Sequence, residues 1–130
     1  MQAPVDQVRH PGRMLTVLIP KVFYDDLTIG IDLFVDGIGM QVLHQDDTLV
    51  VAARDGAKVY LVEDREFALK DRPELTIETD EIERVYADVA ARRPDLLHPN
   101  LARVTRQPWG AREFALVDSS TVCVVFRDWT

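Results

Sequence analysis

Apolar and polar residues follow two different periods along the chain, and their order predicts the secondary structure. Leu15, Val17 and Ile19 alternate with other residues, which predicts a strand over Met14–Phe23. Asp25 or Asp26 can then supply an N-cap, and apolar residues return at helical spacing up to Gly37, which predicts a helix over Asp26–Gly37. Three further strands are predicted from short apolar runs: Met40–His44, Thr48–Ala53 and Lys58–Val62.

The second half of the chain repeats this order after a charged linker at Glu63–Pro73. Leu75 and Ile77 alternate as in a strand, and a capping-box-like pair begins a helix predicted over Asp80–Arg92. Three more strands are predicted over Leu101–Thr105, Glu113–Val117 and Val122–Phe126. Both halves therefore have the order βαβββ, which indicates a weak internal duplication with modules at residues 14–63 and 74–128.

The last hairpin carries the most specific motif. The run W-G-x-R-E-F-A-L-x-D from Trp109 to Asp118, followed by C-V-x-F from Cys123, resembles the bleomycin-resistance proteins. These belong to the vicinal oxygen chelate superfamily, with the glyoxalases and extradiol dioxygenases. Leu33-Phe34-x-x-x-Ile38-Gly39-Met40 is similar to a second motif of that superfamily, F-Y-x-x-x-L-G-F.

The resemblance, which covers residues 14–126, implies an α+β fold. Two βαβββ modules would form a curved mixed sheet around a cavity, with the helices outside. Residues 14–130 would be a single domain of the glyoxalase/bleomycin-resistance type, and residues 1–13 a flexible N-terminal arm. The resemblance also implies a homodimer, because a second copy usually closes the half-open cavity in this family.

One turn departs from the family pattern. The family has D-P-x-G before the last strand, whereas this chain has Asp118-Ser119-Ser120-Thr121. Threonine does not easily adopt the positive φ that glycine accepts, so we expect this hairpin to have a different shape.

The catalytic members of the superfamily hold a divalent metal, and the resemblance places the metal ligands at Ile19, Tyr60, Glu74 and Val125. Only Glu74 is a good ligand for a hard cation, and a catalytic metal needs three or more protein ligands. We therefore expect no metal and no other cofactor. The alternative is a metal-dependent lyase or dioxygenase of the same superfamily with atypical ligands.

Other catalytic signals are weak. Cys123 lies in an apolar strand, where a buried thiol is more often inert than nucleophilic. His44 and His98 fall beside turns and are interpreted as surface residues. We expect no catalytic residues, and the single cysteine fits a reducing cytoplasm.

Charge and composition narrow the range of partners. A formal net charge of −7 disfavours nucleic acid and attracts cations, although acidity also serves solubility alone. No apolar run reaches the roughly 20 residues of a membrane-spanning helix, so we expect no membrane insertion.

These observations predict a metal-independent protein that binds, and sequesters, a cationic or aromatic small molecule. By resemblance, Trp109 stacks on the planar rings of the ligand; the alternative is that it packs as a lid over the sheet edge. Glu113 and Arg112 are interpreted as a solvated ion pair, and a module for protein interaction is a third possibility. The expected cavity lining is apolar and aromatic with one carboxylate: Ile19, Phe34, Tyr60, Glu74, Cys123 and Val125.

Overall fold

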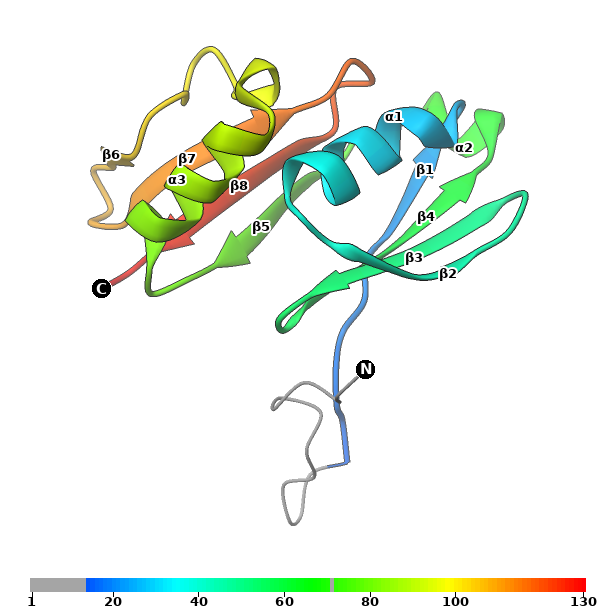
Figure 1. Ribbon diagram of the computed structural model, residues 1–130, viewed down its shortest axis with the longest axis horizontal. Helices are drawn as coiled ribbons and strands as arrows, with labels where there is room; N and C mark the ends of the chain where they lie inside the picture. The colour runs from blue at the N-terminus through cyan, green and yellow to red at the C-terminus, as the bar shows by residue number, and fades with distance from the viewer. Residues whose placement is uncertain (1–13, 71) are drawn as a thin grey trace.

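The computed structural model describes residues 14–70 and 72–130, and the arm expected over residues 1–13 lies outside the described residues. The described chain forms two βαβββ units (Figure 1). Its elements, in order, are β1 (Lys21–Tyr24), α1 (Leu27–Ile31), η2 (Asp32–Gly37), β2 (Gln41–Gln45), β3 (Leu49–Arg54), β4 (Ala57–Glu63), α2 (Arg65–Ala68), β5 (Glu74–Glu78), α3 (Ile82–Arg92), η3 (Pro94–Leu96), β6 (Thr105–Arg106), β7 (Arg112–Val117) and β8 (Cys123–Asp128).

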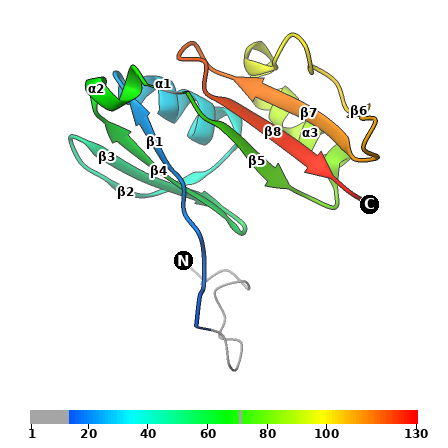
Figure 2. The ribbon, with the colours of Figure 1, turned by 180° about the vertical axis from the view of Figure 1, so that it is seen from behind.

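Each unit contributes one four-stranded mixed sheet. The strand orders are β1-β4-β3-β2 and β5-β8-β7-β6 (Figure 2). Strand β1 pairs with β4 and β5 pairs with β8 in parallel, and the other pairs are antiparallel. The predicted α+β architecture of two βαβββ modules is confirmed. Within the described residues the sheets stay separate, so one chain does not close them into a single sheet.

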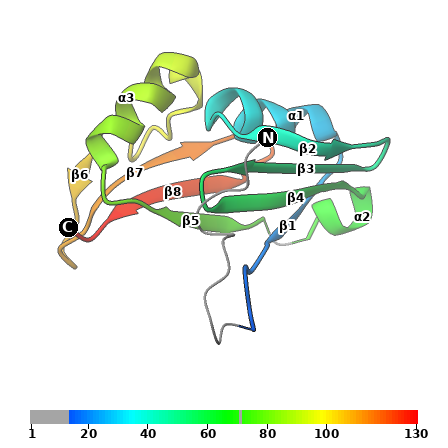
Figure 3. The ribbon, with the colours of Figure 1, turned by 60° about the horizontal axis from the view of Figure 1, so that its bottom comes forward.

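The longer helical segments cover one face of the two sheets, and the short α2 (Arg65–Ala68) packs on the opposite face of β1 through Phe67 on Phe23. In Figure 3, α1, η2 and α3 all lie on the same side of the two sheets. Val59 and Leu61 of β4 and Phe114 and Leu116 of β7 face this layer and are fully buried in one shared core. Burying such a side chain contributes about 1.5–3 kcal/mol. Strand alternation then places the intervening residues on the other side, which we call the open face of each sheet.

The first predicted helix is present over its expected length, but its second half is wider. Asp26 caps α1 by accepting a hydrogen bond from the Thr28 amide, as its position predicts. The segment η2 is a π-helix, in which the Ile38 amide donates to the Leu33 carbonyl five residues earlier. A Cβ on Gly37 would lie 2.8 Å from a Leu96 methyl group, so glycine permits this close approach to the second module.

The largest differences from the sequence prediction concern the first strand, the linker and β6. The first strand begins at Lys21 rather than Met14, because among the described residues no strand pairs with residues 14–20. The linker contains the short helix α2, which Asp64 caps. The strand predicted over Leu101–Thr105 is reduced to the two residues of β6, because the preceding loop contacts β7 through single bonds such as Ala115 N–H to the Leu101 carbonyl.

The turn before β8 differs from the expectation that Thr121 would avoid a positive φ. Thr121 does adopt a positive φ, of 65°, despite its branched side chain. Asp118 explains how: its Oδ1 accepts hydrogen bonds from the amides of Ser120 and Val122, and its carbonyl accepts one from Thr121. The aspartate therefore organises the turn, and the strained threonine follows from it.

Two polar contacts, one buried and one partly buried, join the two modules. The Tyr24 hydroxyl of β1 donates to Asp118 Oδ2 at 2.7 Å. Burial raises the pKa of Asp118, and the hydrogen bond from Tyr24 is the main effect that holds this pKa down. On the other side of the core, Arg54 of β3 donates to Asp88 of α3 at 2.7 Å. The relative position of the modules is therefore held by specific partners as well as by apolar packing.

Candidate ligand-binding site

The open face of the second sheet gathers most of the predicted site residues. Register places Glu74 of β5 beside Cys123 of β8, and Val125 beside Thr76. These side chains project away from the helices, because the intervening Val124 belongs to the core. Glu74 is exposed, Cys123 is half-buried and Val125 is buried. The face is therefore apolar at its centre and carries a carboxylate at its edge.

Cys123 is poorly suited to nucleophilic chemistry. Burial raises the pKa of its thiol, and the neighbouring charge of Glu74 raises it further. Because the thiolate is the reactive form, both effects reduce reactivity at neutral pH. The thiol is an apolar lining group here.

Trp109 lies at one end of this face, in the turn before β7. Gly110 takes a φ of 98° in this turn, and its carbonyl accepts a hydrogen bond from Arg106. The Trp109 indole is 55% exposed, and its Nε1 donates to Glu113 Oε2 at 2.9 Å. The ring is thus held by its edge while much of its surface faces solvent, which is the geometry that stacking on a planar ligand requires.

The interpretation of Glu113 and Arg112 as a solvated pair is wrong. Glu113 is only 3% exposed and pairs with Arg127 on β8, its cross-strand neighbour. Arg112 points to the other side, where it meets buried Asp128 at 3.4 Å. Adjacent residues of a strand face opposite sides, so the two charges could not meet.

Sequence reasoning missed a second indole on the same face. Arg127 lies over the Trp129 ring, with 5.8 Å between its Cζ and the ring centroid. Trp129 Nε1 donates to Glu78 of β5 at 2.9 Å. The signal was present in the chain, because continuing the alternation of Val125 and Arg127 by two residues beyond β8 places Trp129 on the same face.

Tyr60 and Ile19 lie with the first sheet instead. Tyr60 is half-buried on the open face of β4, opposite Lys21 and Val51. Ile19 is half-buried just before β1, and the next carbonyl, that of Pro20, accepts a hydrogen bond from the Tyr60 amide. These two residues therefore neighbour each other but belong to a different sheet from Glu74.

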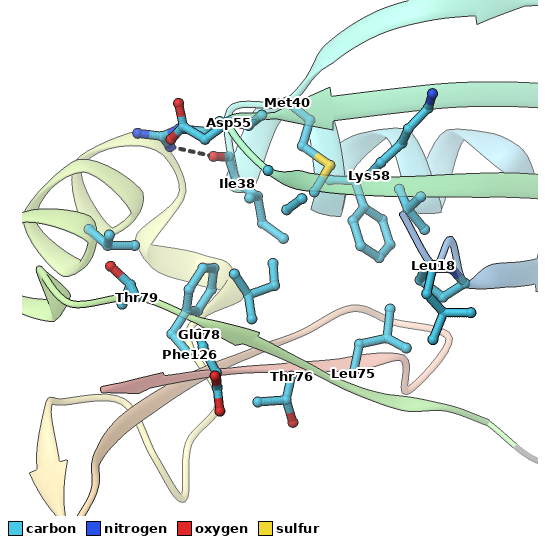
Figure 4. Close-up of a pocket in the computed structure, with 18 residues that line it drawn as sticks. Leu18, Ile38, Met40, Asp55, Lys58, Leu75, Thr76, Glu78, Thr79 and Phe126 are labelled. Atoms are coloured by element: carbon cyan, nitrogen blue, oxygen red, sulfur yellow. Dashed lines mark hydrogen bonds between the residues drawn. The ribbon is translucent and has the colours of Figure 1, made fainter. Parts of the chain in front are cut away.

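Phe34 lies on the helix side, in a pocket of about 490 Å³ between the two modules (Figure 4). Met40, Leu75 and Phe126 point into this space, whereas Thr76 points to the opposite side of β5. The walls are mainly apolar. Phe34 is nearly fully buried, so it serves the core at the same time.

The donor set does not fit the divalent metal that the superfamily implies. Over residues 14–70 and 72–130, no three histidine, cysteine, aspartate or glutamate side chains converge. His44 is bonded to Asp46 on the surface, and the Nδ1 of His98 accepts the Asn100 amide. Glu74 has no second carboxylate or imidazole partner at the expected positions, so we derive no chemistry through a metal.

No helix in the described part of the chain is long and apolar enough to cross a membrane. No protein-family model matches the chain, and no curated protein matches it by sequence.

Solved structures do match. The bleomycin-binding protein from Streptomyces verticillus, complexed with copper(II)-bleomycin, superposes with a TM-score of 0.67 at 20% identity, over 87% of this chain and 97% of its own. A glyoxalase/bleomycin resistance protein/dioxygenase from Alicyclobacillus acidocaldarius superposes with a TM-score of 0.65 at 18% identity, over 93% of this chain and 94% of its own. Lactoylglutathione lyase from Agrobacterium tumefaciens superposes with a TM-score of 0.65 at 15% identity, over 88% of this chain and 95% of its own. Together with the two βαβββ modules, these similarities show that the chain has the vicinal oxygen chelate fold.

Proposed function

We propose that the protein reversibly binds a cationic, partly aromatic small molecule, without a metal and without turnover. The observation that carries this proposal is the open face of the second sheet. There a half-exposed residue, Trp109, lies at the end of the face where Glu113 meets Arg127. Buried Val125 lies at the centre of this face, and the carboxylate of Glu74 lies at its other end. An aromatic ring and a negative charge on one face favour a flat cation.

The charge of the whole chain supports the same ligand class. The formal net charge is −7, which attracts cations over long range and is screened by salt. A protein of the same fold has been solved as a complex with copper(II)-bleomycin, so this fold can hold a large ligand of this type.

We propose further that the binding protein is a homodimer. Three apolar side chains before β1 are almost fully exposed: Met14, Leu15 and Leu18. Strands β1 and β5 are both open edges of their sheets, and the groove between the modules is apolar. Exposed apolar chain and unpaired strand edges are covered when a second copy supplies the complement. A dimer would also bring the open face that carries Tyr60 towards the open face that carries Glu74.

Titration of bleomycin and of simpler aromatic cations, followed by tryptophan fluorescence, tests the proposed function. Trp109→Ala should weaken binding by about 1–3 kcal/mol and leave the fold intact, because the indole is half exposed. Glu74→Gln should weaken binding of cations, and added salt should reduce affinity. Trp109→Phe is the matched control, since it keeps an aromatic face.

The proposal fails if no aromatic cation binds and the protein instead turns over a glutathione adduct or a catechol when a divalent metal is added. That result would favour the alternative of a lyase or dioxygenase with atypical ligands.

A further inference from the structure

A connected row of side chains crosses the open face of the second sheet beyond Trp109. One oxygen of Glu113 accepts from both Trp109 and Arg127. The Arg127 guanidinium lies over the ring of Trp129, and Trp129 donates to Glu78. Each indole is therefore held by a carboxylate, and the guanidinium lies between them.

Trp129 is firmly positioned although it lies beyond the last residue of β8. The preceding residue, Asp128, is 1% exposed and accepts from the Ile82 amide at the start of α3. Its other oxygen accepts from the Thr130 amide at 2.8 Å, which fixes the backbone on the far side of Trp129. Nevertheless the indole is 55% exposed, the same fraction as Trp109. A large apolar ring that is held by its edge and still exposes its face is available for contact with a ligand.

The charge along this row favours a positive ligand. Arg127 is compensated by Glu113, with which it forms an ion pair. Glu78 accepts from the neutral Trp129 indole and lies opposite Arg127, which already pairs with Glu113. Two carboxylates therefore face one guanidinium, and the row keeps a net negative charge. Glu78 and Glu74 also lie on the same face of β5, because they are separated by four residues of strand.

We propose that Trp129 is a second stacking residue of this site, so that a planar heteroaromatic cation contacts both indoles. Glu78 orients the Trp129 ring and supplies the charge that selects a cation over a neutral ring. This inference rests on the proposed function, because it extends the same surface from Trp109 to the end of β8.

Two matched probes test it: 9-aminoacridine, a planar cation at neutral pH, and acridine, its uncharged analogue. The chain contains two tryptophans, so Trp109→Phe leaves Trp129 as the only indole emitter. We expect 9-aminoacridine to quench Trp129 emission in this variant. Trp129→Ala should raise the Kd about tenfold, and Trp129→Phe should restore most of the affinity. Leu69→Ala, at an exposed apolar position after α2 in the linker, should bind like the original chain.

Glu78→Gln should bring the Kd values of 9-aminoacridine and acridine closer together, an effect that a purely structural role would not produce. The inference is overturned if Trp129→Ala binds 9-aminoacridine as tightly as the original chain while Trp109→Ala weakens it; the proposed function then stands without it. If neither probe nor bleomycin binds the original chain, the proposed function is overturned and the inference with it.

Discussion

At the residue scale, Tyr24 and Asp118 provide the sharpest test of how the two modules are held. The Tyr24 hydroxyl donates to a carboxylate whose pKa is already raised by burial. Tyr24→Phe removes this donor and should lower the free energy of unfolding by about 1–3 kcal/mol at pH 7, because an ionised buried group loses a partner. The pKa of Asp118 should then rise further in the folded state.

This pKa shift predicts the pH dependence of the loss. In the folded state the pKa of Asp118 lies above its usual value of 3.8, and that of the variant lies higher still, so the full deficit is present only above the folded-state pKa of the variant. As the pH falls, Asp118 becomes protonated in both states and the deficit should shrink. Urea unfolding at pH 7, and at the lowest pH where the original chain and Tyr24→Phe both fold, measures the difference between their free energies of unfolding. Tyr86→Phe is the control, because Tyr86 donates to a neutral carbonyl, that of Ala102. Equal pH profiles for the two variants would contradict the prediction.

At the element scale, the turn between β7 and β8 stores strain at Thr121. A left-handed backbone costs a residue with a Cβ about 1–2 kcal/mol, whereas glycine loses about 0.5–1 kcal/mol through its freer unfolded chain. Thr121→Gly should therefore raise the free energy of unfolding by about 0.5–1 kcal/mol. Ser119→Gly, in the same turn but without a positive φ, should lower it. Chemical denaturation measures the free energy of unfolding of both variants. A Thr121→Gly variant that is less stable than the original chain would show that the turn is not strained.

At the scale of the whole molecule, the segment before β1 decides between monomer and dimer. Leu18 is 94% exposed and borders the groove between the modules. We expect the protein to sediment as a dimer at tens of micromolar and Leu18→Asp to shift it towards monomer, because a charge cannot enter an apolar interface without loss. Leu69→Asp, a similar change at the exposed residue that follows α2, should leave the dimer intact. A monomer for the original chain under these conditions would refute the assembly.

Local sequence determined the order of elements and the direction of many side chains. Periods of 2 and 3.6 residues, together with the cap at Asp26, specify βαβββ in each half because they depend only on near neighbours. Alternation along β8 similarly places Cys123 and Val125 on one face. The hairpin motif that begins at Trp109 was specific enough to indicate the fold.

Tertiary structure alone decided which distant groups meet. Glu113 pairs with Arg127 rather than Arg112, and Tyr24 finds Asp118 across 94 positions of sequence, because strand register and module packing select those partners. The same holds for the start of β1 at Lys21, since a strand exists only where a neighbour pairs with it. A pattern along one segment carries no information about which other segment will lie beside it, so these contacts become visible only in the folded chain.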